Sequence, residues 1–256
     1  MRVVIKIGTS TLAHKTGLLN ILRVEELCKV MSDLKNAGNE VILVSSGAIG
    51  MGVGKLGLRS KPSDIPTKQA AAAVGQCELM YTYDRLFSEY NHTVAQILIT
   101  GDDIEHADRK ANFINTMARL LELSAIPIIN ENDSISTNEI EIGDNDTLGA
   151  IVATAVDADL LIILSDIDGL YTANPRENKD AKLLHTVESI TPEIESMVGG
   201  AGSDLGTGGM ITKLKAAKIV TEKGIDMVIA NGDNPHTLYD IISGKDVGTR
   251  FLGKVN

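Results

Sequence analysis

The chain has 256 residues, of which 43% are hydrophobic and 23% are charged, which is enough for one large domain with a buried core and for two domains at most. Its formal charge of −10 argues against a nucleic-acid partner, because that affinity comes largely from lysine and arginine side chains on phosphates. The first apolar run is too short for a signal peptide and no apolar stretch is long enough to cross a membrane, so we expect no membrane partner.

Short apolar runs alternate with longer amphipathic segments along the chain. The runs predict strands at Val3–Ile7, Val41–Val44, Val94–Ile99, Ile126–Ile129, Leu160–Leu164 and Asp226–Ala230. Near-continuous runs of Val, Ile and Leu are typical of strands covered on both faces, so we expect a mainly parallel sheet. Helical spacing in Leu79–Tyr90 and Leu148–Val156 places helices between the strands. The alternation predicts an open α/β sheet with helices on both sides.

One domain over residues 1–256 accounts for this pattern, with an N-terminal lobe over about 1–150 and a C-terminal lobe over about 151–256. Residues 137–142 alternate polar and apolar side chains, which indicates a small antiparallel hairpin. Cys28 and Cys77 lie in helix-like segments and match no metal or redox spacing, so we expect free thiols in a reducing cytoplasm.

Lys6 is a charge inside an otherwise apolar strand. A buried ammonium group needs a partner such as a carboxylate or a ligand phosphate. The alternative is an edge strand whose lysine points to water, and this strand alone does not distinguish the two. Gly8, which follows the strand, lets the backbone approach a ligand closely.

Ser45–Gly50 follows a strand and opens a predicted helix. Free N–H groups and the helix dipole suit such a junction to an anion, although a serine that only caps the helix is the commoner arrangement. Gly52–Gly57 matches the dinucleotide pattern G-x-G-x-x-G but falls inside or after the helix, and no acidic residue ends a second strand at the required distance. We reject a dinucleotide site there and expect a flexible loop.

Two clusters rich in carboxylates and amides follow in the sequence. Asn130–Asp133 ends a strand, and Gly143–Asp146 opens a helix. They could bind a metal, an ammonium group or a lysine, whereas the second could also be a turn with an Asx cap. Because ligands of open α/β sheets bind beyond the carboxyl ends of the strands, we favour a binding role.

Two further segments contain glycine turns or loops. Ser165 and Asp166 end another strand, and Asp168–Tyr171 continues it through a glycine turn. Gly206–Lys213 is a glycine loop with Thr and Lys that runs into a helix, which suits phosphate binding but is not a Walker A loop. A mobile surface loop is the alternative.

Taken together and in this order, the segments Lys6–Ser10, Ser45–Ala48, Asn130–Asp133, Gly143–Asp146, Asp168–Tyr171, Asn174–Arg176 and Gly206–Lys213 resemble the amino acid kinase family. The resemblance runs from Met1 to about Phe251. In detail it is to members that phosphorylate the side-chain carboxylate of L-glutamate with ATP, the first step of proline biosynthesis. The Asn130–Asp133 and Gly143–Asp146 pair is its most specific part.

The resemblance implies an αβα sandwich with glutamate over the N-terminal lobe and ATP over the C-terminal lobe. It places Lys6 and Lys213 on the transferred phosphoryl group, with Asp146 holding both lysines. It assigns glutamate binding to Ser46, Asp133 and Asn145, with Asn130 and Asp144 close by. It assigns nucleotide binding to Lys6, Gly8, Ser165, Asp166, Thr207, Gly208, Gly209, Met210, Ile211, Thr212 and Lys213.

The resemblance also implies Mg²⁺ held mainly by the ATP phosphates, with no metal ligands assigned in the protein. It implies proline as a feedback inhibitor, a homo-oligomer, and handover of the product to glutamyl phosphate reductase. Two departures are expected. Many bacterial members carry a C-terminal PUA domain that this chain lacks, and Asn174 stands where an Asp is usual.

The implied nucleophile is a carboxylate with a reference pKa of about 4.3, so it is ionised at neutral pH and needs no general base. This agrees with five histidines that fit no triad or metal spacing. Other acceptors on the same fold stay open, namely acetylglutamate, aspartate, carbamate or a nucleoside monophosphate. A non-catalytic amino-acid sensor is the more distant alternative.

Overall fold

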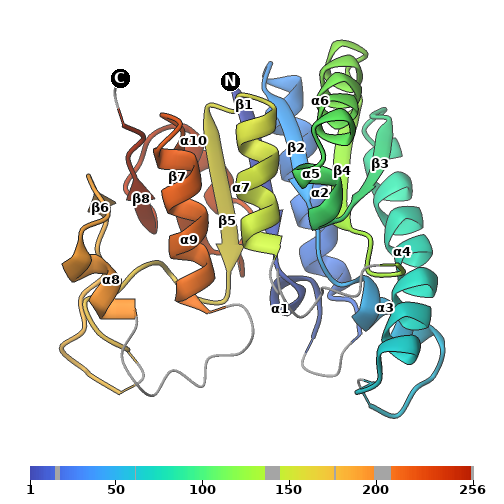
Figure 1. The fold of residues 1–256 in the computed structure, drawn as a ribbon, viewed down its shortest axis with the longest axis horizontal. Coiled ribbons are helices and arrows are strands. Elements are labelled where there is room, and N and C mark those ends of the chain that lie inside the picture. The colour runs from blue at the N-terminus through green and yellow to red at the C-terminus, as the bar shows by residue number, and fades with distance from the viewer. Residues whose placement is uncertain (15–17, 61, 136–144, 176, 199–208, 255–256) are drawn as a thin grey trace.

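An eight-stranded sheet runs through the centre of the structure (Figure 1). The computed structural model describes residues 1–14, 18–60, 62–135, 145–175, 177–198 and 209–254. Across these residues the strand order is β3-β4-β2-β1-β5-β7-β8-β6, and the neighbouring strands are parallel except for β7 and β8. The strands are β1 (Arg2–Ile7), β2 (Glu40–Val44), β3 (Val94–Ile99), β4 (Ile126–Glu131), β5 (Leu160–Ser165), β6 (Thr186–Val187), β7 (Asp226–Asn231) and β8 (Thr249–Phe251).

The predicted strands are confirmed as β1, β2, β3, β4, β5 and β7. The structure extends β4 to Glu131 and β5 to Ser165, so polar residues belong to the strand ends themselves. β6 and β8 were not predicted, because two and three residues are too few to show a period. The hairpin expected at residues 137–142 lies outside the described residues.

Helices cover both faces of the sheet, and in Figure 1 α7 and α9 lie in front of it while α2 lies behind. The helices are α1 (Thr9–Leu12), α2 (Ile21–Asn36), α3 (Ala48–Lys55), α4 (Ile65–Ser88), α5 (Gly101–Glu105), α6 (Ala107–Glu122), α7 (Asn145–Ala155), α8 (Pro192–Val198), α9 (Met210–Thr221) and α10 (Thr237–Ile242). None of the described helices is long and apolar enough to cross a membrane. Tyr90, expected on the apolar stripe of α4, lies beyond its end and is 38% exposed.

Alternate residues of β1 enter two different cores. Val3, Ile5 and Ile7 pack in the cluster that includes α2, α4 and α10. Val4 packs in the cluster that includes α6, α7 and α9. This period of two is what a strand covered on both faces requires. The three layers therefore confirm the predicted αβα sandwich with a mainly parallel sheet.

Helices α3 and α4 meet through glycines. A Cβ atom on Gly75 would lie 1.7 Å from the carbonyl oxygen of Ala48, and one on Gly52 would lie 1.8 Å from that of Ala71. The flexible loop expected over residues 52–57 is therefore wrong for Gly52–Lys55, which belong to α3. Glycine is used here for close approach of two backbones and not for flexibility.

We predict that Gly75→Ala destabilises the protein by about 1–3 kcal/mol or more, because the added methyl group must push two helix backbones apart. Urea unfolding followed by circular dichroism measures this change. Gly54→Ala in α3 is the matched control, since a Cβ there would be 3.7 Å from the nearest atom, Leu18 Cδ2. The control should be neutral or stabilise by up to about 1 kcal/mol. Equal stability of the two variants would contradict the close contact.

Candidate active site

Lys6 lies on the central strand β1, which runs between β2 and β5. Its side chain points to the same face as Val4, the face covered by α7 and α9, and it is 4% exposed. The edge-strand alternative is therefore wrong. Helix α7 packs closely over this position, because a Cβ on Gly149 would lie 3.4 Å from Lys6 Cβ.

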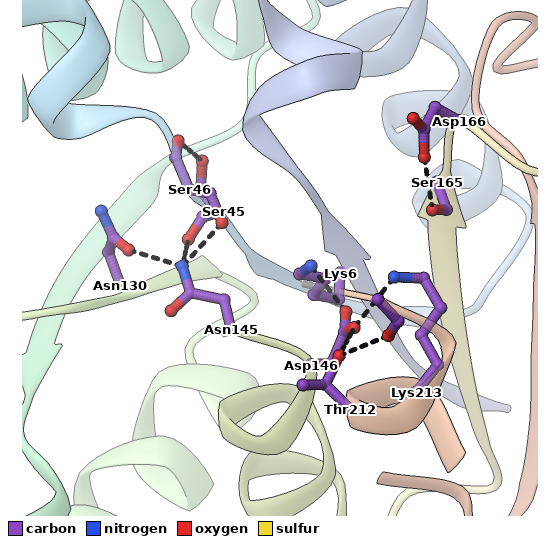
Figure 2. Close-up of polar contacts among 11 residues, drawn as sticks. Lys6, Ser45, Ser46, Asn130, Asn145, Asp146, Ser165, Asp166, Thr212 and Lys213 are labelled. Carbon is purple, nitrogen blue, oxygen red and sulfur yellow. Dashed lines mark hydrogen bonds and ion pairs between the residues drawn. The ribbon is translucent and has the colours of Figure 1, made fainter. Parts of the chain in front are cut away.

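Asp146 joins Lys6 to Lys213. Lys6 Nζ lies 2.6 Å from Asp146 Oδ1, and Lys213 Nζ lies 3.1 Å from Asp146 Oδ2 (Figure 2). The Thr212 hydroxyl also donates a hydrogen bond of 3.1 Å to Oδ2. Asp146 is fully buried, and Lys213 is 5% exposed. We call Lys6, Asp146, Thr212 and Lys213 the lysine cluster.

The lysine cluster carries two ammonium groups for one carboxylate. Asp146 lies in the first turn of α7, and Lys213 lies in the first turn of α9. The positive ends of two helix dipoles therefore add to the excess of positive charge. A cation at a helix N-terminus is unfavourable by itself, and Asp146 offsets that repulsion. An anion placed here would gain from both lysines and from both helix N-termini.

Asn145 organises a second group of polar side chains. Its Nδ2 carries two hydrogens and lies within hydrogen-bonding distance of three acceptors, Ser45 O at 2.6 Å, Ser46 Oγ at 2.7 Å and Asn130 Oδ1 at 3.0 Å (Figure 2). We call Ser45, Ser46, Asn130 and Asn145 the amide cluster. Ser46 does not cap helix α3, because the N-cap residue is Gly47 in a left-handed conformation with φ +96°. The capping alternative for Ser46 is therefore wrong.

The two clusters are joined covalently at the start of α7. Asn145 and Asp146 are consecutive, and their side chains turn to different groups, one to β4 and the residues just after β2, the other to β1 and α9 (Figure 2). The geometry thus sets a polar, amide-lined site directly beside a positively charged one.

The remaining site residues predicted from the sequence lie at or next to the ends of strands and helices. Gly8 is the N-cap residue of α1, and a Cβ there would lie 3.7 Å from Lys6 Nζ. Ser165 ends β5, and its hydroxyl donates to Asp166 Oδ1 at 3.3 Å. Asp133 is half-buried just beyond the end of β4.

The N-cap of α9 is Gly209, with Met210 and Ile211 in the first turn. Asp144, Thr207 and Gly208 lie outside the described residues. Within the described ranges, no group of three or more His, Cys, Asp or Glu side chains could hold a metal ion.

Sequence reasoning missed two buried side chains of α4. Gln76 is 7% exposed, and its Oε1 accepts a 2.9 Å hydrogen bond from Asn130 Nδ2. The Tyr83 hydroxyl lies 2.9 Å from Ser45 Oγ, and burial raises the pKa of this phenol, so it stays protonated. The sequence feature that could have indicated a buried Gln76 is its position on the same helical stripe as Leu79 and Tyr83.

The expectation of free thiols is confirmed for both cysteines. Cys28 is buried and Cys77 is exposed, and neither forms a disulfide. Burial raises the pKa of the Cys28 thiol.

An αβα sandwich that gathers two buried ammonium groups and two helix N-termini beside an amide-lined site has the architecture of a protein that handles anionic, phosphate-bearing ligands. The chain belongs to the amino acid kinase family, whose sequence profile matches residues 1–231.

Curated relatives from several bacteria are similar over nearly the whole chain. A protein from Clostridium perfringens named glutamate 5-kinase is 58% identical, covering 99% of this chain and 96% of the relative. A glutamate 5-kinase from Listeria innocua is 50% identical, with 99% and 93% covered. The glutamate 5-kinase of Moorella thermoacetica is 52% identical over 98% of this chain, but only 66% of that relative is covered.

Solved structures of more distant proteins share the fold. Carbamate kinase from Giardia lamblia superposes with a TM-score of 0.69 at 17% identity, covering 98% of both chains. UMP kinase from Bacillus anthracis gives a TM-score of 0.64 at 17% identity, covering 99% of this chain and 96% of that one.

We predict that Asp146→Asn lowers the free energy of unfolding by about 3–5 kcal/mol, because it leaves two buried ammonium groups without their shared carboxylate. Lys213→Met should cost less, since it leaves the Lys6–Asp146 pair intact. Urea titration of both variants ranks them, and added inorganic phosphate should recover more stability in Asp146→Asn than in the wild type. A larger loss in Lys213→Met would show that Asp146 is not the counter-charge that holds the cluster together.

Proposed function

We propose that the chain transfers the γ-phosphate of ATP to the side-chain carboxylate of L-glutamate, which yields glutamyl 5-phosphate. The observation that carries the proposal is the pairing of Asn145 and Asp146, which sets the amide cluster directly beside the lysine cluster. An acceptor in the first site would face a phosphoryl group in the second. The names of the relatives at 50–58% identity support the choice of glutamate.

The chemical problem of this reaction is the approach of two anions. The acceptor carboxylate has a reference pKa of about 4.3 and is already ionised at neutral pH, so no group has to remove a proton from it. Lys6 and Lys213 neutralise the charge on the phosphoryl oxygens, and Asp146 positions both ammonium groups before the ligands arrive. Catalysis in this scheme is alignment and electrostatic stabilisation.

Mg²⁺ would be held by the ATP phosphates and would neutralise part of their charge. The ammonium groups of Lys6 and Lys213 suit the oxygens of the same phosphates.

Glutamate would occupy the N-terminal lobe. Ser46, Asn130 and Asn145 supply hydroxyl and amide groups, and Asp133 supplies a carboxylate that can pair with the substrate ammonium. Asp144 is proposed to lie close by. This division also assigns the acceptor to about residues 1–150 and the nucleotide to about 151–256.

ATP would lie over the C-terminal lobe. Gly8, Ser165, Asp166 and the segment from Gly209 to Lys213 surround the phosphate position, with Thr207 and Gly208 proposed to continue it. The backbone N–H groups at the start of α9 and the Lys213 ammonium are suited to phosphate oxygens.

The wider setting is part of the same proposal. Two free thiols are suited to a reducing cytoplasm. The product is an acyl phosphate that water hydrolyses, so transfer to glutamyl phosphate reductase would protect it. Proline as a feedback inhibitor and a homo-oligomeric assembly complete the proposed regulation.

The test of function is a coupled assay of ATP consumption in which hydroxylamine traps the acyl phosphate. With Mg²⁺ and ATP, we expect glutamate to be turned over in preference to aspartate, acetylglutamate, carbamate and UMP. Preference for another acceptor would show that the protein is an amino acid kinase with a different substrate. Calorimetric binding of glutamate without ATP turnover would instead indicate an amino-acid sensor.

We predict that Lys6→Ala and Lys213→Ala each lower kcat by about 100-fold or more, with little change in the glutamate KM, because both ammonium groups act on the transferred phosphoryl group. Steady-state kinetics of the folded variants measures both constants. Lys218→Ala is the matched control on α9, where Lys218 is 41% exposed and pairs with Glu195. Near-normal turnover in either active-site variant would remove that lysine from the mechanism.

A further inference from the structure

Helix α4 supports the amide cluster from outside the proposed substrate site. Gln76 and Tyr83 are seven positions apart, so they lie on one face of the helix two turns from each other. Gln76 contacts Asn130 and Tyr83 contacts Ser45, both at 2.9 Å. Two buried polar side chains of one helix therefore form hydrogen bonds with residues of the same cluster.

The orientation of the Asn130 amide is fixed by a group that can only donate. The backbone N–H of Glu131 donates to Asn130 Oδ1 at 2.9 Å, so the oxygen must face it. Asn130 Nδ2 then faces Gln76, where Oε1 accepts its hydrogen bond. Gln76 thus supplies the acceptor that this orientation requires.

The orientation of the Asn145 amide is fixed from the opposite end. The carbonyl oxygen of Ser45 can only accept, so Asn145 Nδ2 must face it, and the same nitrogen also donates to Asn130 Oδ1. If the Asn130 amide turned over, its nitrogen would confront two donors, Glu131 N–H and Asn145 Nδ2. The two amides are therefore locked as a pair, and Gln76 completes the lock.

Packing alone does not call for a glutamine at this position. Gln76 is 7% exposed on a helix whose neighbouring buried residues include Ala72 and Leu79. Burying an amide costs free energy unless it is hydrogen-bonded, and an apolar side chain of similar size would fill the same space. The polar group is thus explained by what it does to Asn130.

We infer that Gln76 is a positioning residue that sets the affinity for the acceptor by holding the Asn130 and Asn145 amides in one orientation. This inference rests on the proposed function, because it takes the amide cluster as the glutamate site. A site whose groups are already oriented avoids the cost of ordering them when the ligand binds.

The experiment compares Gln76→Met, which keeps the length of the side chain and removes the acceptor, with the wild type. Calorimetry without nucleotide gives the glutamate Kd, and steady-state kinetics gives kcat and the KM of each substrate. Thr82→Val is the matched control in α4, because Thr82 is 8% exposed and its hydroxyl donates to the backbone of its own helix, at Glu78 O.

We predict that Gln76→Met raises the glutamate Kd and KM about tenfold while the ATP KM and kcat stay near their wild-type values. Thr82→Val should shift the melting temperature at most and leave the glutamate Kd unchanged. A loss of packing alone would lower the melting temperature of Gln76→Met without this selective change in affinity. If Gln76→Met does not fold, Gln76→Asn withdraws the oxygen by one methylene and should weaken glutamate binding in the same way.

Equal glutamate affinity in the wild type and the folded Gln76 variant would overturn the inference and leave the proposed function standing. A wild type that binds glutamate without turning over ATP would overturn the proposed catalysis, whereas the titration would still decide the role of Gln76. A wild type that does not bind glutamate would overturn both.

Discussion

The contact of Asp146 with Lys6 and Lys213 is the constraint on which the rest of the site depends. Each of the three residues comes from a different element, and each is almost completely removed from water. Burial of such charges is tolerable only when they are paired and hydrogen-bonded. The strand order meets this requirement, because it puts β1 beside β5 and β5 beside β7, with α7 and α9 on one face. The fold thus brings two ammonium groups to one carboxylate near the carboxyl ends of the parallel strands of a mainly parallel sheet.

The start of α7 divides the work of the proposed reaction between two neighbouring residues. Asp146 serves the charged half of the site, which any phosphoryl transfer needs, and Asn145 serves the half that would recognise the acceptor. Carbamate kinase and UMP kinase share the fold at 17% identity, so the backbone alone cannot decide the acceptor. In the proposed function, the choice of acceptor would therefore depend on side chains such as those of the amide cluster.

Much of the fold could be predicted from the sequence because fully buried strands consist of nearly continuous runs of Val, Ile and Leu. The polar strand ends could be found for the same reason, since they interrupt such runs, as Asn130 and Ser165 do. The strands β6 and β8 were not predicted because they are too short to show a period. Gly52 was predicted to lie in a loop because the presence of glycine does not distinguish a turn from a close contact between helices. The role of Gln76 could not be predicted for a related reason. A glutamine within a helix is usually exposed, and only its three-dimensional partner, Asn130, reveals a buried role.

The glycine contact between α3 and α4 lies next to residues of the proposed substrate site. Gly75 meets the carbonyl of Ala48, and Gln76 is the next residue along α4. Ala48 in turn begins the helix that follows Ser45 and Ser46. Because no side chain separates the two backbones, the distance from α4 to the amide cluster is set by direct backbone contact and not by adaptable packing. The close backbone contact that packs α3 against α4 therefore also fixes the reach of Gln76 to Asn130.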